Sequence, residues 1–293
     1  MFIISVDGGL GNQMFEYAFY LAMKKNFPDG KVMLDLSMLE EDTHNGYELQ
    51  YVFGINAPIA ALEDVAKLSE YCPRQIKHNK LINQLNKLRR AIWGTKWSYI
   101  VQEDSTVYYD DYFHLSMLYS YYLRGVWANS QYFKDVKKKV LEEFTFPEIA
   151  DEKNKAIAEE IRNTNSVGIH FRKGDYVEFG FEILDKSYYN SALQYINERV
   201  AGAKFFVFSD DKEGAKATIG GQIDYVFIDG NTGRNAYIDM NLMSMCKHNI
   251  IANSTFSFWG AFLNRNLSKI VVYPLQPIKG CKYPYMDNDW VGL

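Results

Sequence analysis

The residues of this chain best suited to chemistry lie in one stretch near its middle, Ser166-Val-Gly-Ile-His-Phe-Arg-Lys-Gly-Asp-Tyr176. Its first half is apolar and β-branched and has the length of a buried strand. It ends in Arg172, Lys173, Gly174 and Asp175. Arg presents a planar fork to phosphate, and Lys a point charge. Two cations and a turn-forming glycine after a strand therefore suit a polyanion site, although a solvated charged turn has the same composition.

A glycine-rich turn near the N-terminus, Asp7-Gly-Gly-Leu-Gly-Asn-Gln13, is the second candidate. A strand is predicted before it and a helix after it, which brings backbone N–H groups and a helix N-terminus to an anion. Met14 occupies the third glycine position of a dinucleotide fingerprint, and no Gly-Lys-Ser/Thr follows, so neither of those phosphate loops is present. The side chains of Asn12 and Gln13 could reach a ligand or cap the helix.

Two further predicted strands end in polar residues. One runs from Lys204 into Ser209, Asp210 and Asp211, whose carboxylates could hold a ribose or a guanine N–H edge, or cap the next helix. The other precedes the capping types Asn253, Ser254 and Thr255. The N–H groups of the helix that follows would form a second phosphate cradle. The aromatic stripe of that helix, which begins at Phe256, is expected to be core.

Alternating strands and helices must position these residues. The pattern predicts strands over residues 2–6, 31–36, 121–127, 167–171, 204–211, 225–228, 248–252 and 271–272, the last closing the sheet. It predicts helices over 14–26, 60–71, 130–144, 151–162, 186–200 and 237–246, with 39–56 irregular. Both halves begin with strand, turn and helix, so we expect two α/β domains, 1–155 and 156–293, facing each other across a cleft, with the boundary around 145–165.

The bulk composition is that of an ordinary soluble globular protein, with 293 residues, 47% hydrophobic and 23% charged. A net charge of −4 argues against a general nucleic-acid binder. Cys72, Cys246 and Cys281 are odd in number and lack metal spacing, which indicates reduced thiols and a cytoplasmic protein. No apolar run reaches transmembrane length, and the N-terminus lacks the basic region of a signal peptide.

One segment, residues 74–102, is basic and amphipathic. It holds seven Lys and Arg residues and no acidic one, and Leu81, Leu85, Leu88 and Ile92 line one face. Such a helix can lie on an anionic membrane, here the inner membrane. The alternative, which we favour from sequence, is a helix packed on the first domain with a solvated basic face.

Two sequence patterns bear on metal ligation. Asp287-Asn-Asp289 has the Asp-x-Asp form of metal-dependent nucleotide-sugar enzymes, but it follows no apolar strand. The five histidines lack zinc spacing. We therefore expect no metal and no cofactor.

Four stretches together resemble the α-1,2-fucosyltransferases of glycosyltransferase family 11. They are Gly8-Gly-Leu-Gly-Asn-Gln-Met-Phe-Glu-Tyr-Ala18, residues 170–177, residues 205–211 and residues 239–264. The resemblance covers most of the chain outside residues 40–120, where acceptor determinants are expected. It implies a GT-B fold with two Rossmann-type domains. It also implies a GDP-fucose donor, inverting transfer to O2 of a terminal galactose, and no required metal.

The resemblance also implies roles for individual residues. Arg172 would hold the diphosphate, and Asn12 would approach the phosphates or the fucose from the other domain. The remaining donor-binding candidates are Gly9, Gly11, Gln13, His170, Ser209, Asp210, Asp211, Asn253, Ser254, Thr255 and Phe256. Lys173, Glu16 and Phe258 depart from the family's usual Arg, Gln and Trp, and none of these changes removes the proposed diphosphate grip.

The catalytic base and the exact reaction stay open at this stage. Base candidates are Asp7, Glu16, Asp175 and Glu178; we choose Asp175, which could instead pin its turn by accepting backbone N–H bonds. Two other functions compete with α-1,2 transfer to galactose. One is a fucosyltransferase of another linkage, α-1,6 or protein-directed, and the other is a non-catalytic GDP- or glycan-binding module. The absence of an anchor points to a bacterial cytoplasmic enzyme that binds GDP-fucose and a galactose-terminated glycan.

Overall fold

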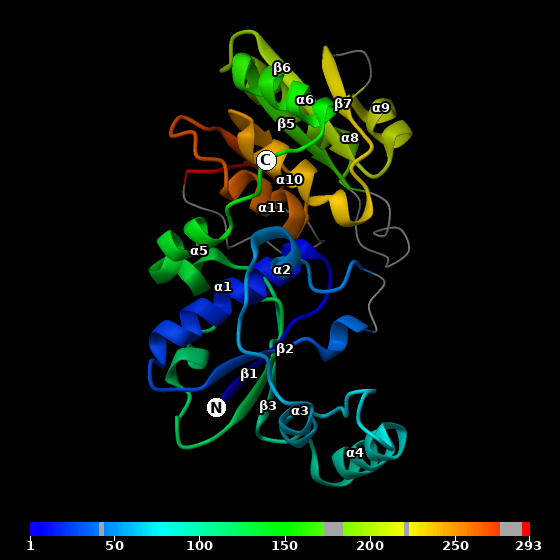
Figure 1. The fold of residues 1–293 in the computed structure, drawn as a ribbon. Helices are drawn as coiled ribbons and strands as arrows, with labels where there is room; N and C mark the ends of the chain where they lie inside the picture. The colour runs from blue at the N-terminus through cyan, green and yellow to red at the C-terminus, as the bar shows by residue number, and fades with distance from the viewer. Residues whose placement is uncertain (41–43, 173–183, 220–222, 276–288) are drawn as a thin grey trace. The chain divides into compact units, whose positions relative to one another are not determined.

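The computed structural model describes residues 1–40, 44–172, 184–219, 223–275 and 289–293, which form two compact units, 1–145 and 146–293 (Figure 1). The division falls inside the expected range but earlier than residue 155. The reason is helix α6 (Glu152–Asn163), which packs on helix α10 (Tyr237–Met245) of the second unit. Its residues Ala158 and Ile161 share a buried cluster with Leu242 and Met243.

Unit 1 contains a four-stranded parallel sheet in the order β2-β1-β4-β3. The strands are β1 (Phe2–Ser5), β2 (Val32–Asp35), β3 (Tyr99–Val101) and β4 (Tyr121–Arg124). Helix α1 (Leu10–Asn26) follows β1 and is buried along most of its length. It begins four residues before the predicted start, because Gly9 in extended conformation already serves as its N-cap. Gly11, Asn12 and Gln13 therefore lie in the helix and not in the loop.

The remaining helices of unit 1 correct two expectations. The region expected to be irregular contains η1 (Ser37–Glu40) and α2 (Glu48–Phe53). The helix expected over 130–144 is divided into η3 (Ser130–Val136) and α5 (Lys137–Glu143), with non-helical backbone at Phe133. The other helical elements are α3 (Leu62–Leu68), α4 (Asn79–Trp93) and η2 (Asp110–His114).

Unit 2 contains a six-stranded parallel sheet in the order β10-β9-β8-β5-β6-β7. Its strands are β5 (Asn165–Phe171), β6 (Ala203–Ser209), β7 (Tyr225–Ile228), β8 (His248–Ile250), β9 (Val271–Tyr273) and β10 (Val291–Gly292). The expectation that residues 271–272 close the sheet is wrong, because β10 pairs with β9 beyond them. A two-residue strand has too little periodicity to be read from sequence.

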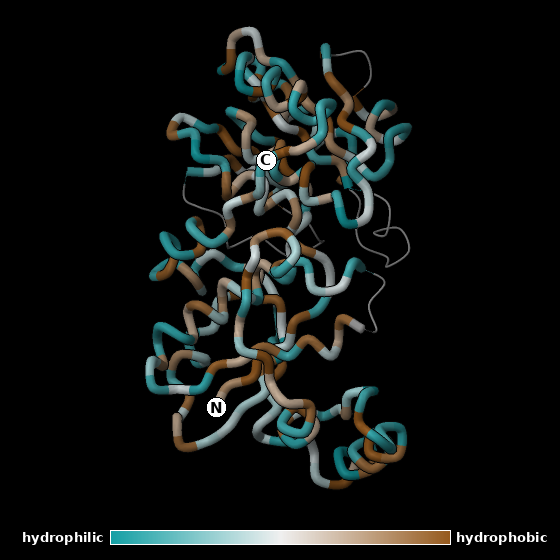
Figure 2. The backbone as a smooth tube through the Cα atoms, viewed as in Figure 1, coloured by the Kyte–Doolittle hydropathy of each residue, from teal (hydrophilic) through white to brown (hydrophobic). Residues whose placement is uncertain are grey.

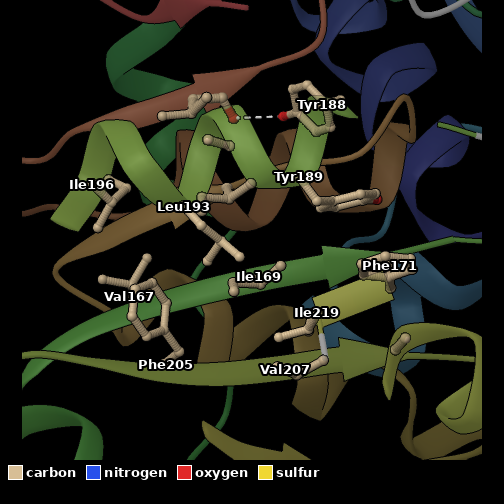
Figure 3. Packing of buried hydrophobic residues seen from close by; sticks show 14 of the residues in the cluster. Val167, Ile169, Phe171, Tyr188, Tyr189, Leu193, Ile196, Phe205, Val207 and Ile219 are labelled. Atoms are coloured by element: carbon tan, nitrogen blue, oxygen red, sulfur yellow. Dashed lines mark hydrogen bonds between the residues drawn. The ribbon is translucent and has the colours of Figure 1, made fainter. Parts of the chain in front are cut away.

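Helices cover both faces of this sheet. On one face, helix α8 (Lys186–Asn197) packs Leu193 and Ile196 over Val167 and Ile169 of β5 (Figure 3). Phe171 stacks on Tyr189, with ring centroids 3.9 Å apart. Side chains of β6 alternate between the faces, so Phe206 and Phe208 join the opposite cluster with α6 and α10. Helix α9 (Lys212–Ile219), η4 (Gly233–Asn235) and α11 (Thr255–Phe262) complete the described elements.

Helix α4 corrects the packing that we favoured from sequence. Leu81, Leu85, Leu88 and Ile92 do line one face, but all four are exposed, and no residue of α4 is buried. The helix is instead tied to the unit through polar residues. No helix among the described residues is long and apolar enough to cross a membrane.

Candidate functional site

Three neighbouring strands of unit 2 bring the predicted residues to one edge of its sheet. After β5, the chain adds β6 and β7 on one side, and then β8 and β9 on the other. The gap between the ends of β5 and β8 is therefore a topological switch point, the usual ligand position in open parallel sheets. Arg172 follows β5, and Asn253 and Ser254 follow β8. Phe171 pairs in register with Ser209 at the end of β6.

His170 connects the two sides of this switch point. Its ring lies against Phe256 of α11, with centroids 5.7 Å apart and planes inclined by 30°. Only 5% of its surface is exposed, and its Nδ1 has no hydrogen-bond partner among the described residues. Buried polar atoms are normally paired, so this nitrogen is a point at which a ligand atom would bind. Burial, and then the charge of Arg172, lower the pKa of His170 to about 3, so the imidazole is neutral at physiological pH.

Arg172 supplies the positive charge that His170 does not. Its Nη1 lies 2.9 Å from Oδ2 of Asp210, and both side chains are partly exposed. A guanidinium carries five N–H donors in a fixed fork. Arg172 can therefore keep its contact with Asp210 and present other N–H groups to a phosphate. The pairing fixes which way the fork points, which a single exposed arginine would not achieve.

Helix α11 presents its N-terminus beside His170. The Oγ of Ser254 accepts from the N–H of Phe256 at 3.3 Å and so serves as the N-cap. Ser257 donates its hydroxyl back to the carbonyls of Ala252 and Ser254, at 3.2 and 3.1 Å. The carbonyl of Ser254 also accepts from the N–H of Phe258 at 3.0 Å, so this residue fixes the first turn of the helix. Trp259 and Leu263 of the predicted stripe are buried, whereas Phe256, its first member, is only partly buried.

Within the turn after β6, the structure separates two alternatives left open by sequence. Asp211 caps the next helix, because its Oδ1 accepts from the N–H of Gly214 at 3.0 Å. Ser209 closes the turn by accepting from the N–H of Asp211 at 2.9 Å. Asp210 is the member that contacts Arg172. Asp211 is therefore the helix cap, whereas Asp210 is the ion-pair partner of Arg172.

The glycine turn of unit 1 is held by buried polar side chains. Gln13 is fully buried; its amide donates to the carbonyls of Gly8 and Gly46, at 2.9 and 2.8 Å, and accepts from the N–H of Glu48 at 2.9 Å. Both carboxylate oxygens of Glu16, also fully buried, accept from the N–H of Asp7. Gln13 thus joins residues 8, 46 and 48, and Glu16 fixes the end of β1.

Glycine is required at position 8 of this turn. Its φ is +70°, and a Cβ there would lie 2.7 Å from Nδ2 of Asn12. The same close approach places the Asn12 amide over the turn, in the first turn of α1 and partly exposed. Gly9 approaches the ring of His44, which a Cβ would meet at 3.0 Å. Among the donor-binding candidates of unit 1, Asn12 is the one whose side chain is partly exposed.

Several predicted residues lie outside the described part of the chain. These are Lys173, Asp175, Glu178 and Asp287. Among the residues that the structure does describe, no group of three or more His, Cys, Asp or Glu side chains could hold a metal ion.

Sequence reasoning missed one titrating group in unit 2. Asp239, in the first turn of α10, accepts from Asn231 at 2.7 Å, and Asn231 exchanges hydrogen bonds with Asn154. Burial raises the pKa of Asp239 to about 6. The three side chains come from α6, α10 and the loop after β7, so no local pattern in the sequence could have united them. The network joins the segment before β5 to the carboxyl end of the sheet.

Two α/β units with parallel sheets form a GT-B-like fold, the class of fold that many glycosyltransferases have, and unit 2 places a charged fork and a helix N-terminus at its switch point. The fucosyltransferase NodZ from Bradyrhizobium has a similar fold, with a TM-score of 0.50 at 14% identity, covering 88% of this chain and 90% of that one. Glycosyl transferase family 11 matches residues 1–292. The chain therefore belongs to that family, and it is an enzyme rather than a binding module.

Two relatives illustrate the range of the family. The chain is 34% identical over 285 residues to the alpha-1,2-colitosyltransferase of Escherichia coli, covering 93% of this chain and 90% of that protein. It is 25% identical over 311 residues to the galactoside 2-alpha-L-fucosyltransferase Sec1 of Mus musculus, covering 100% of this chain and 74% of that protein.

Proposed function

We propose that the chain transfers L-fucose from GDP-β-L-fucose to O2 of a terminal β-galactose in a glycan, with inversion and without a metal. The observation that carries this proposal is the grouping of His170, Arg172 and Phe256 at the switch point of unit 2. Family membership, and relatives named as galactoside fucosyltransferases, support the donor sugar and the acceptor.

The residues of the candidate site have separate parts in donor binding under this proposal. Arg172 holds the diphosphate, with Asp210 keeping its guanidinium in orientation. The start of α11 adds backbone N–H donors at the positive end of the helix dipole, other than the Phe256 N–H that Ser254 caps. His170, being neutral, contributes a hydrogen bond without charge, and Phe256 is its platform. Asn12 is proposed to contact the phosphates or the fucose.

The chemistry is a displacement at the anomeric carbon of fucose. The acceptor oxygen forms a bond to this carbon, while the bond to the phosphate oxygen breaks and GDP leaves with its electron pair. The developing charge on the diphosphate is stabilised by donors that are already in place, foremost Arg172. The proton of the attacking hydroxyl passes to a carboxylate base, for which Asp175 is our candidate.

A colitosyl donor is the second candidate, because the 34% identical relative is named as a colitosyltransferase. Colitose differs from fucose by the lack of one hydroxyl. A site that hydrogen-bonds that hydroxyl rejects the deoxy sugar strongly, whereas an apolar site discriminates weakly between the two. Comparing GDP-fucose with GDP-colitose on the same acceptor therefore decides between the donors.

The testing experiment measures GDP release from GDP-fucose, with and without EDTA, on lactose, N-acetyllactosamine and Gal-β1,3-linked acceptors. Acceptor-dependent release that survives EDTA supports metal-independent fucosyl transfer, and the product linkage is then read by NMR. Release abolished by chelation would overturn metal independence and return attention to Asp287 and Asp289. Transfer only to a non-galactoside acceptor would replace the proposed linkage with an α-1,6 or protein-directed one.

We also propose a cytoplasmic location with peripheral contact to the inner membrane, and no cofactor. Cys72 and Cys246 are both buried thiols outside any disulfide, in keeping with a reducing compartment.

A further inference from the structure

Helix α4 is mounted on unit 1 with its polar side inward. Asn83 accepts from the N–H of Cys72 at 2.6 Å and donates to the carbonyl of Cys72 at 3.1 Å. Arg89 pairs with Glu70, whose carboxylate also accepts from the N–H of Lys96. These contacts fix both the position of α4 and its rotation about its own axis.

Because the polar side of α4 faces unit 1, its apolar side faces solvent. Leu81, Leu85, Leu88 and Ile92 are 56, 55, 62 and 69% exposed. Their spacing of four, three and four residues keeps them on one stripe of a helix about 22 Å long. Amphipathic surface helices normally bury this stripe. Here specific polar anchors hold the apolar stripe outward. Figure 2 shows brown residues among teal ones along α4.

The apolar surface continues beyond the helix. Trp93 at the end of α4 is 74% exposed and Trp97 is 66% exposed. Trp97 contacts Tyr119 edge-to-face, with centroids 5.2 Å apart, and the neighbouring Leu118 is 90% exposed. Exposed Trp beside exposed aliphatic residues is the composition of a membrane–water interface.

The positive charge around the stripe favours an anionic partner over a second copy of this chain. Residues 74–102 contain seven basic side chains and no acidic one, within a chain of net charge −4. Lys80 and Lys87 are exposed on the flank of the stripe. A second copy of this chain would place these cations against each other, with no carboxylate from the same segment to pair with them. One pair of helices of this length is also small beside the interface of a stable dimer.

We propose that α4, with Trp93 and Trp97, is a docking surface for an anionic lipid bilayer. The helix lies parallel to the membrane, with its leucine stripe at the boundary between headgroups and acyl chains and Lys80 and Lys87 at the level of the lipid phosphates. The proposal does not depend on which sugar the enzyme transfers. It places unit 1, where acceptor recognition is expected, at the membrane surface.

The test is flotation of the full chain with phosphatidylethanolamine vesicles, with and without phosphatidylglycerol. Binding is expected only with phosphatidylglycerol and should fall as salt rises. L85Q/L88Q should weaken binding at least tenfold per leucine, because a glutamine does not enter the acyl boundary. K80Q/K87Q should weaken it about thirtyfold, from about 1 kcal/mol per lysine.

The matched control is L267Q, which changes a fully exposed leucine of unit 2 and should bind as wild type does. All variants should keep their melting temperature and their rate on a soluble galactoside, because the altered residues are exposed on the surface of unit 1 or unit 2. This separates loss of membrane binding from loss of catalysis.

Four outcomes would overturn the proposal. They are no vesicle binding by the wild type, binding that is insensitive to salt, wild-type binding by L85Q/L88Q, and a wild-type dimer in sedimentation that L85Q/L88Q converts to monomer. The last would assign the stripe to a second copy of the chain.

Discussion

At the scale of single residues, the candidate site divides charge and hydrogen bonding between two neighbours. Arg172 is the cation, oriented by Asp210. His170 lies two residues earlier, in β5, and is kept neutral by burial and by the Arg172 charge.

Replacing Arg172 with alanine should lower kcat about 100- to 1000-fold, because the leaving diphosphate loses a preset donor. Arg172→Lys should recover only part of the rate, since an ammonium lacks the fork. The measurement is GDP release at saturating acceptor, with circular dichroism to establish folding. Arg162→Ala, which removes an exposed arginine of α6, is the matched control. A folded Arg172→Ala enzyme with near-normal rate would refute the role.

His170 should make the free energy of unfolding decrease as pH falls. Its folded pKa of about 3 lies below the ordinary value near 6.5, so between these values the unfolded chain binds more protons. The contribution of the neutral His170 to the free energy of unfolding is fully present above about pH 6.5 and is lost as pH falls toward 3. Urea unfolding of His170→Gln should therefore show a shallower decline, by at most about 1.4 kcal/mol per pH unit. Parallel curves for the two proteins would contradict a buried neutral imidazole.

At the scale of elements, the same kind of turn is stabilised differently in the two units. In unit 1, the glycine turn is held from beneath by buried Gln13 and Glu16, which bond to backbone groups. In unit 2, the ends of β5, β6 and β8 are held by helix caps and by ring stacking. The first arrangement leaves the Asn12 amide over the turn, and the second leaves Arg172 beside a helix N-terminus.

Burial of Asp239 should make unit 2 less stable as pH rises. The folded pKa of Asp239, about 6, lies above the ordinary value near 3.9, so the folded chain binds more protons between these values. Asp239→Asn should therefore be more stabilising, relative to wild type, at pH 7 than at pH 4. Thermal unfolding at both pH values measures this.

Asp229 provides a control, because its contribution to stability should depend on pH in the opposite direction to that of Asp239. It lies at the end of β7, where hydrogen bonds from Lys153 and then Lys212 hold its pKa below the ordinary value. Asp229→Asn should lose stability at neutral pH and approach wild type in acid. Equal effects of Asp239→Asn at both pH values would show that the carboxyl is not protonated near pH 6.

At the scale of the whole molecule, the two units have separate sheets and cores. Unit 2 holds the switch-point site, and unit 1 holds both the Asn12 turn and the outward-facing α4. A division of this kind suits an enzyme that takes a soluble nucleotide sugar and an acceptor at a surface.

Hydrogen exchange with GDP should map the donor site directly. We expect slower exchange at the carboxyl ends of β5, β6 and β8 and in the first turn of α11, and no change in α4. Slower exchange in the first turn of α1 would support the phosphate role of Asn12, whereas protection confined to unit 2 would limit Asn12 to the fucose or the acceptor. Protection of α4 by GDP would conflict with its assignment as a docking surface.

The sequence by itself determined the features that depend on neighbours along the chain. Hydrophobic runs placed the described strands other than β3 and β10 to within a few residues. The local caps Asp151 and Asp185 start α6 and α8 through bonds to N–H groups two or three residues on. The motif residues could likewise be identified, because Arg172 and the 253–256 segment directly follow apolar strands.

Only the tertiary structure decided which residues from distant segments contact one another. Arg172 meets Asp210 because β5 and β6 pair with Phe171 opposite Ser209, and His170 meets Phe256 because β8 pairs on the other side of β5. Helix α4 shows the same limit. Periodicity fixed which of its residues share a stripe, but the direction of that stripe depends on Asn83 and Arg89 bonding to Cys72 and Glu70. Those bonds join different segments of the chain, so no pattern within the helix encodes them.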